Sequence, residues 1–330
     1  MYDQIMLFIF GLLLLIKGGD WFVEGATSIA HRFHLPELLI GATVVSIGTT
    51  LPEVMVSATS AIAGHGEIAY GNAIGSIICN TALIAAVTVA VRPAATPGRA
   101  LRVPVIFFFG SAAVYLFSAY VLGRFPRWIG FLLLAIFLGY MTLQVIAARR
   151  APLAVSPENP MPENDVHDDD LPELSLLTAL AKLVLGAALI ALGADLLVDN
   201  GTRIAEAIGV PESVIALTFV ALGTSLPELV TAVTALSKGH GALSLGNIIG
   251  ANIFNLVLVS GVSVALSPFA IPGGTTLFGA PTSLVLDIPV MLAVMLLLTL
   301  PALLRGKLYR WQGIALLGVY AAFCTLQFVL

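Results

Sequence analysis

The chain has 330 residues, of which 58% are hydrophobic and only 10% are charged, and its formal net charge is −4. The mean hydropathy of +1.01 excludes an ordinary soluble domain and indicates a polytopic membrane protein. Much of the acidity lies in one loop, so the net charge does not indicate a nucleic-acid partner.

Ten apolar segments are long enough to cross a bilayer, which takes about 20 residues. The first of them starts close to Met1, lacks a preceding basic region and is too long for a cleaved signal peptide, so we expect it to act as its own insertion signal. We expect transmembrane helices at residues 5–30, 38–63, 70–91, 103–122, 128–148, 174–200, 212–236, 243–267, 283–303 and 310–329.

The longest polar stretch, residues 149–173, is rich in proline and acidic residues. We interpret it as a flexible linker, because Asp168-Asp169-Asp170 lacks the glycine and the regular ligand spacing of a calcium-binding EF-hand loop. This linker divides the chain into a first half, residues 1–148, and a second half, residues 174–330.

The two halves are related by an internal repeat. Sliding the sequence by 175 positions aligns residues 11–87 with residues 186–262 without a gap. Each half would hold five helices, and an odd number means that the second half enters the membrane from the opposite side. The predicted fold is therefore an all-α integral membrane protein with ten transmembrane helices in two inverted five-helix repeats. Pairs in register include Gly11 with Gly186, Asp20 with Asp195, Pro36 with Pro211, Glu53 with Glu228, and Asn80 with Asn255.

Basic residues predict the orientation of these helices. The loops on one side would carry only Arg124, Arg127 and Arg203. The positive-inside rule then places the acidic linker in the cytoplasm, both termini outside, and the protein in the cytoplasmic membrane. The loops on the opposite side carry Arg32, Arg92, Arg99, Arg102, Arg149, Arg150, Lys182, Lys238, Arg305, Lys307 and Arg310.

One phrase occurs once in each repeat, as Gly48-Thr49-Thr50-Leu51-Pro52-Glu53 and as Gly223-Thr224-Ser225-Leu226-Pro227-Glu228. A carboxylate at the bilayer centre costs roughly 3 kcal/mol or more, so it needs a function. The proline frees the carbonyl oxygen four residues earlier, and the first threonine and the glutamate lie one helical turn apart. Hydroxyl, carbonyl and carboxylate oxygens would thus converge, as they do around hard cations such as sodium or calcium.

A second polar stripe follows each phrase. Asn72, Ser76 and Asn80 are spaced by four residues, and their counterparts are Asn247, Ala251 and Asn255. Small residues and amides at this spacing also serve as helix packing, but we favour a binding role because we expect the stripes to face the glutamates. Two such glutamates repel by roughly 4 kcal/mol at 4 Å and an effective dielectric of 20. The site must therefore hold a divalent cation, monovalent cations or protons, which compete for the same ligands.

The remaining polar residues have simpler interpretations. His65 and His240 lie between glycines and are interpreted as turn residues. Asp287 is a lone acid in the ninth predicted helix and is placed close to the interface. Four further carboxylates near helix ends are interpreted as interfacial and solvated, in preference to a cation funnel: Asp20, Glu24, Asp195 and Asp199.

The paired phrases, together with the stripes Gly71 to Asn80 and Gly246 to Asn255, resemble the two alpha-repeats of the calcium/cation antiporter superfamily, and prokaryotic sodium/calcium exchangers above all. The resemblance implies that Glu53 and Glu228, with the carbonyls of Thr49 and Thr224, coordinate calcium. It further implies that Asn80 and Asn255 complete the centre. The sodium sites it implies use Thr50, Ser76 and Ser225, with backbone oxygens of Ser46 and Ala221.

The resemblance implies a secondary active antiporter, not an enzyme, that exchanges calcium for sodium by alternating access. No cofactor and no nucleic acid are expected; the partners are calcium and sodium ions and the lipid bilayer. Ala251 replaces a serine and Asn255 an aspartate of some relatives, so a calcium/proton or potassium-assisted exchanger is the alternative. A membrane protease would need a glycine-x-glycine-aspartate motif that is absent here, and a passive cation channel would differ by its much faster currents.

Overall fold

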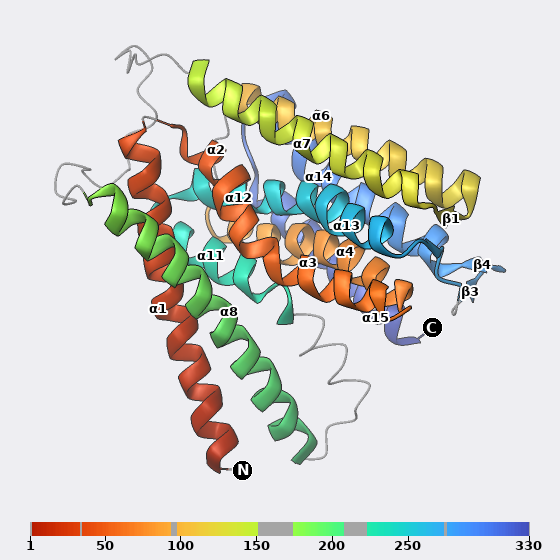
Figure 1. Ribbon diagram of the computed structural model, residues 1–330, viewed down its shortest axis with the longest axis horizontal. Helices are drawn as coiled ribbons and strands as arrows, with labels where there is room; N and C mark the ends of the chain where they lie inside the picture. Colours follow the sequence, from red (N-terminus) through yellow and green to blue (C-terminus); the bar gives the residue numbers. More distant parts are fainter. Residues whose placement is uncertain are drawn as a thin grey trace.

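The computed structural model describes residues 2–33, 35–93, 98–150, 174–207, 223–273 and 276–329. This part of the chain is almost entirely helical (Figure 1). Helix α7 continues through Arg149 and Arg150, two residues into the expected linker. The rest of the linker lies outside the described residues.

Some helices of the chain contain π-helical segments, labelled η, in which the backbone is wound more loosely than in an α-helix. In the first half the elements are α1 (Tyr2–Arg32), α2 (Glu37–Ile40), η1 (Gly41–Val45), α3 (Ser46–Ile62), α4 (Gly66–Cys79), η2 (Asn80–Ala85), α5 (Ala86–Val91), α6 (Gly98–Leu116), η3 (Phe117–Leu122) and α7 (Arg127–Arg150).

In the second half the helical elements are α8 (Leu176–Ala207), α11 (Leu226–Ser237), α12 (Gly241–Phe254), η6 (Asn255–Val259), α13 (Ser260–Leu266), η7 (Ser283–Asp287), α14 (Ile288–Arg305) and α15 (Arg310–Val329). Two-residue strands form two small antiparallel pairs, β1 (Arg124–Phe125) with β2 (Phe269–Ala270) and β3 (Thr276–Leu277) with β4 (Ala280–Pro281). The first pair joins the loops of the two halves at one end of the molecule.

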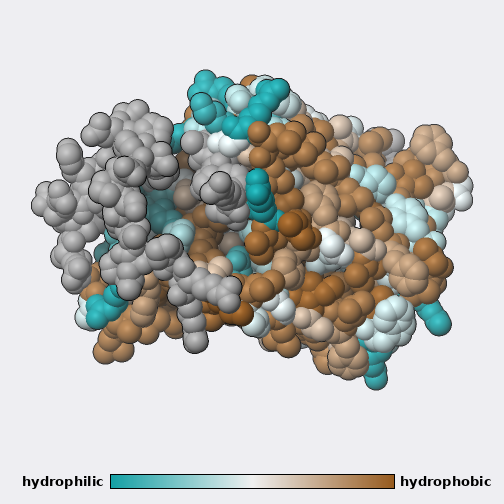
Figure 2. Space-filling model, turned by 90° about the horizontal axis from the view of Figure 1, so that it is seen from above, coloured by the Kyte–Doolittle hydropathy of each residue, from teal (hydrophilic) through white to brown (hydrophobic). Residues whose placement is uncertain are grey.

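Eight helices within the described ranges are long and apolar enough to cross a membrane. They agree with eight of the ten predicted segments to within a few residues at each end, although helix α8, which contains the sixth segment, continues to Ala207. The tenth predicted segment is helix α15, and the seventh is described only from residue 223 onwards, where it contains α11. Apolar side chains cover much of the described surface (Figure 2), as expected for a protein surrounded by lipid.

The 175-residue offset is kept in the backbone. Helices α4 and α12 begin at Gly66 and Gly241, and the π-helical segments that follow begin at Asn80 and Asn255. The preceding turns contain glycines with φ of 86° and 89°, Gly64 and Gly239. The glutamate phrases differ, however. Pro52 lies inside the continuous helix α3, whereas Thr224 and Ser225 form a turn before α11 begins.

The long helices α1 and α8 lie against each other at one side of the molecule (Figure 1) and run antiparallel. A Cβ atom on Gly18 would lie 2.8 Å from the Ile190 nitrogen and 2.9 Å from the Gly186 oxygen. Gly11 packs against Gly193 in the same way. Residue numbers therefore rise along α1 in the direction in which they fall along α8, so the two helices are antiparallel. Only glycine permits backbones this close.

The centre of the protein is formed by the third helix of each repeat. In the most apolar stretches of residues 66–91 and 241–266, 72% and 83% of the residues are buried, compared with 28% in those of α1 and α8. Their aliphatic side chains form the larger of two hydrophobic clusters, with α14 packed against it. The polar stripes of both repeats therefore lie in the most buried part of the fold.

The close contact of α1 with α8 predicts that Gly18→Ala destabilises the protein by about 1–3 kcal/mol, because a methyl group there must push the two backbones apart. Thermal unfolding in detergent measures the change. Gly139→Ala is the matched control, since Gly139 is an exposed helical glycine with open space around its Cβ position. Equal unfolding temperatures for the two variants would contradict the packing role.

Candidate ion-binding site

Glu53 on α3 and Glu228 on α11 are both completely buried. Their four carboxylate oxygens accept no hydrogen bond from any described residue, and the two side chains repel each other electrostatically. Buried carboxylates are normally paired with a base or with hydrogen-bond donors. Among the described residues this pair has no base beside it, and the Thr49 hydroxyl is the side-chain donor close enough to Glu228 to interact with it, so most of the negative charge is left uncompensated.

The first phrase positions its polar atoms on one face of α3. Thr49, Thr50 and Glu53 are buried, whereas Leu51 is 52% exposed. This pattern follows from the helical period, which brings residues three and four apart to the same face. The Thr50 hydroxyl has no described partner, and neither has the hydroxyl of Ser225 at the equivalent position of the second phrase. These two hydroxyls thus occupy equivalent positions of the two repeats, each three residues before a glutamate.

The first phrase is tied to the stripe of the other repeat. The Ser46 hydroxyl lies 2.7 Å from the Gly41 carbonyl and 2.9 Å from the Asn247 carbonyl, and its single proton is shared between these two acceptors. The Thr49 hydroxyl donates to Oδ1 of Asn247 at 3.2 Å. A Cβ on Gly246 would lie 2.3 Å from the Leu38 oxygen, so glycine allows α12 to approach this closely.

The polar stripe of the first repeat, on α4, is hydrogen-bonded to the glutamate helix of the same repeat, α3. The Asn72 amide donates to the Glu53 carbonyl at 3.2 Å and to the Ser57 hydroxyl at 2.8 Å. Four residues apart along the stripe, Ser76 is buried and Asn80 is completely buried. The side-chain amides of Asn80 and Asn255 have no hydrogen-bond partner in the described part of the chain.

The predicted site residues thus fall into groups. Ser46 uses its hydroxyl for packing, although its carbonyl accepts only a long contact of 3.5 Å from Thr49. Thr224 is partly exposed, and Ala221 lies outside the described residues. Ala251 is completely buried and brings no hydroxyl to its stripe. The predicted residues with buried side-chain atoms that lack a described partner are Thr50, Glu53, Asn80, Ser225, Glu228 and Asn255.

Two polar groups in this region were not expected from the sequence. Thr231, three residues after Glu228, is completely buried, and its hydroxyl has no described partner. Asn252 donates to the Thr81 hydroxyl at 2.7 Å and to the sulfur of Met295 at 3.2 Å. The 175-residue offset pairs Thr231 with a valine and Asn252 with an isoleucine, so the repeat gave no signal for either.

Charged residues at one end of α1 are paired within the protein. Asp20 forms an ion pair with Lys238 at 3.0 Å, and Glu24 forms one with Lys182 on α8. His240, in the turn before α12, contacts Glu37 through Nδ1 at 2.7 Å. These contacts connect α1 with α8 and with the end of α11, at a distance along the helices from the glutamate pair.

This arrangement has known counterparts. A sequence model of the family described as "Sodium/calcium exchanger protein" matches residues 4–146 and 178–329, which is most of the chain. The protein belongs to the sodium/calcium exchanger family. The exchanger is 32% identical to the sodium/calcium exchanger MaX1 of Methanosarcina acetivorans over 98% of each chain. It is also 35% identical to the inner membrane protein YrbG of Escherichia coli over 79% of each chain.

Solved structures agree with this assignment. A structure of the sodium–calcium exchanger NCX_Mj superimposes on the exchanger with a TM-score of 0.80, at 29% identity and with 97% of both chains covered. The exchanger is therefore a multi-pass membrane protein of a transporter family, with the helical fold of NCX_Mj. The resemblance found in the alpha-repeat motifs is confirmed.

The contact between repeats predicts that Asn247→Ala lowers the stability by about 1–3 kcal/mol, because the buried Thr49 hydroxyl loses its side-chain acceptor. Thermal unfolding of purified protein without calcium or sodium measures this effect apart from ion binding. Ser244→Ala, one turn earlier on α12, removes a buried hydroxyl that has no described partner and should change the stability little. A larger loss for Ser244→Ala than for Asn247→Ala would contradict the assigned contact.

Proposed function

We propose that the exchanger moves calcium across the cytoplasmic membrane against sodium, at one central site formed by Glu53 and Glu228. The observation that carries the proposal is the pair of completely buried carboxylates from equivalent positions of the two repeats, with no described base beside them. A pair of like charges in this environment must be neutralised by its cargo. The exchanger is accordingly a transporter and not an enzyme, and it needs no cofactor.

Calcium fits this pair because one divalent ion balances both negative charges and prefers six to eight oxygen ligands. Sodium ions would need to enter more than one at a time to achieve the same balance. The two occupants share ligands, so one must leave before the other is held. The two glutamates would repel by roughly 4 kcal/mol at 4 Å and an effective dielectric of 20, which keeps the empty site from persisting in charged form.

We assign equivalent residues of the two repeats as ion ligands. The carbonyls of Thr49 and Thr224 would complete the calcium site, with the amides of Asn80 and Asn255 on the facing helices. Their buried and unpartnered amides support this role. For sodium we assign the hydroxyls of Thr50, Ser76 and Ser225, with the backbone oxygens of Ser46 and Ala221.

We further propose that the two repeats, residues 1–148 and residues 174–330, are inverted relative to each other and that residues 149–173 form a cytoplasmic linker between them. Alternating access would follow from this inverted symmetry. Two packing directions support the proposal. Helices α1 and α8 are equivalent and run antiparallel. Ala42 and Ser46 of the first repeat meet Gly250, and Leu38 meets Gly246 one turn earlier, so this part of the first repeat runs parallel to α12. Direct repeats would give the opposite directions in both cases.

The names of similar proteins support sodium and calcium as the ions. MaX1 is named a sodium/calcium exchanger, and NCX_Mj crystals were soaked with sodium and with calcium or strontium. One observation favours the alternative of calcium/proton or potassium-assisted exchange. Ala251 is completely buried in the stripe of the second repeat and brings no hydroxyl where Ser76 stands in the first. A sodium site that used this position would have one ligand fewer.

Purified exchanger in proteoliposomes tests the function. Vesicles loaded with sodium and diluted into sodium-free medium should take up radioactive calcium, whereas a pH gradient alone should not drive uptake. Glu53→Gln should reduce uptake to the level of empty vesicles, because the remaining carboxylate balances only half of the calcium charge. Asp3→Asn, a change of an exposed carboxylate at the start of α1, is the matched control and should leave uptake unchanged. Uptake driven by protons alone would overturn the sodium assignment, and normal uptake by Glu53→Gln would overturn the site.

A further inference from the structure

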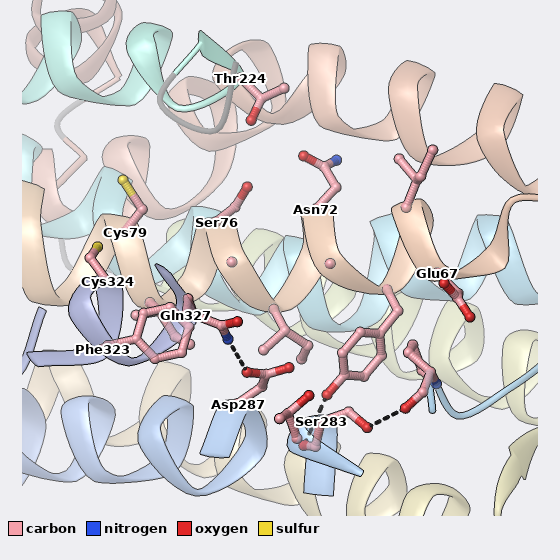
Figure 3. Close-up of a pocket in the computed structure, with 18 of the residues that line it drawn as sticks. Glu67, Asn72, Ser76, Cys79, Thr224, Ser283, Asp287, Phe323, Cys324 and Gln327 are labelled. Atoms are coloured by element: carbon pink, nitrogen blue, oxygen red, sulfur yellow. Dashed lines mark hydrogen bonds between the residues drawn. The ribbon is translucent and has the colours of Figure 1, made fainter. Parts of the chain in front are cut away.

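A cavity of about 600 Å³ lies beside the central site, between α4, the π-helical segment η7 and α15 (Figure 3). Asn72, Ser76 and Thr224 line one wall of this cavity. Glu53 and Glu228 are not among its lining residues. The cavity therefore reaches residues of the proposed ion path from a side that the glutamate pair does not occupy.

The opposite wall carries a carboxylate that the central site does not use. Asp287 ends the π-helical segment η7 and lines the cavity near Gln327 and Ser283, whereas Asn72 and Ser76 line it on the other side of α4 and point toward Thr224 (Figure 3). The amide of Gln327 on α15 donates to Oδ1 of Asp287 at 2.7 Å. This hydrogen bond fixes the carboxylate against α15 and leaves its other oxygen without a described donor.

Asp287 has no cationic partner among the described residues. The ion pairs of the described chain join Glu24 to Lys182, Asp20 to Lys238 and Glu37 to His240. The lining of the cavity contains no lysine, arginine or histidine, and it contains a second carboxylate, Glu67, at its exposed edge. A carboxylate within a transmembrane helix needs compensation, and the cavity gives a small cation room beside it.

The other polar atoms near Asp287 are mostly oxygens. Because the Gln327 amide nitrogen is the donor to Asp287, its carbonyl oxygen remains free to bind a cation. The Ser283 hydroxyl, one turn earlier on η7, donates to the Pro272 carbonyl and keeps lone pairs of its own. Carboxylate, amide and hydroxyl oxygens are ligands of hard cations. A single carboxylate balances a single positive charge, so this group of ligands suits a monovalent ion better than calcium.

We propose that Asp287 and Gln327 form an accessory sodium site in this cavity, distinct from the glutamate pair. An ion held there lies in the same cavity that Ser76 lines, so the site would supply sodium to the central site. This role in supplying sodium rests on the proposed exchange, whereas the binding itself does not.

Direct binding separates the two proposals. The test uses purified full-length protein with Glu53→Gln and Glu228→Gln, which removes both central carboxylates, and radioactive sodium at fixed pH. Saturable sodium binding should remain in this background. Adding Asp287→Asn should weaken it by roughly tenfold or more, since removing the charge removes the ion–carboxylate attraction at contact distance. Adding Asp3→Asn instead should leave it unchanged.

A second variant covers the case in which Asp287→Asn does not fold. Gln327→Glu in the same background places two carboxylates side by side, and it should make the cavity bind calcium in preference to sodium. No saturable sodium binding in the background protein would overturn the proposal. The proposal would also be overturned if the Asp287→Asn protein, shown by gel filtration to be folded, bound sodium as tightly as its parent. It would likewise be overturned if the Gln327→Glu protein gained no calcium binding. None of these results depends on whether the exchanger transports calcium.

Discussion

Two completely buried carboxylates with no base beside them in the described part of the chain are the constraint on which the rest of the structure depends. Glu53 and Glu228 cannot both stay charged and empty there, because burial and mutual repulsion both oppose it. They require a cation or protons at nearly all times. In a transporter this requirement would couple the movement of one ion to that of the other, because the site could release one ion only when another positive charge replaced it.

Close backbone contacts make this centre possible. Gly246 and Gly250 let α12 lie against the first repeat, so that Asn247 reaches Ser46 and Thr49 on the glutamate helix. The glycines of α1 and α8 do the same at the side of the molecule, where two equivalent helices cross. The centre is therefore rigidly packed across the two halves, while α1 and α8 present most of their surface outward.

Much of this architecture could be predicted from the sequence, because membrane helices and repeats leave strong signals. The hydropathy located the helices, and the 175-residue offset paired Asn80 with Asn255, which begin equivalent π-helical segments in the structure. Three features could not be predicted. The turn at Thr224 and Ser225 breaks the symmetry of two nearly identical phrases. Thr231 and the Asn252–Thr81 contact have no counterpart in the other repeat. The cavity beside Asp287 depends on how α14 and α15 pack, and neither helix belongs to the gap-free part of the repeat.

The central claim is that Glu53 and Glu228 form one shared site and not two separate ones. Equilibrium binding of radioactive calcium to purified protein, in the absence of sodium, tests this claim most directly. We expect one calcium ion for each protein molecule, and we expect Glu53→Gln and Glu228→Gln each to abolish binding at concentrations that saturate the unmodified protein. If each single variant retained half of the bound calcium at unchanged affinity, the carboxylates would act independently and the account would be wrong.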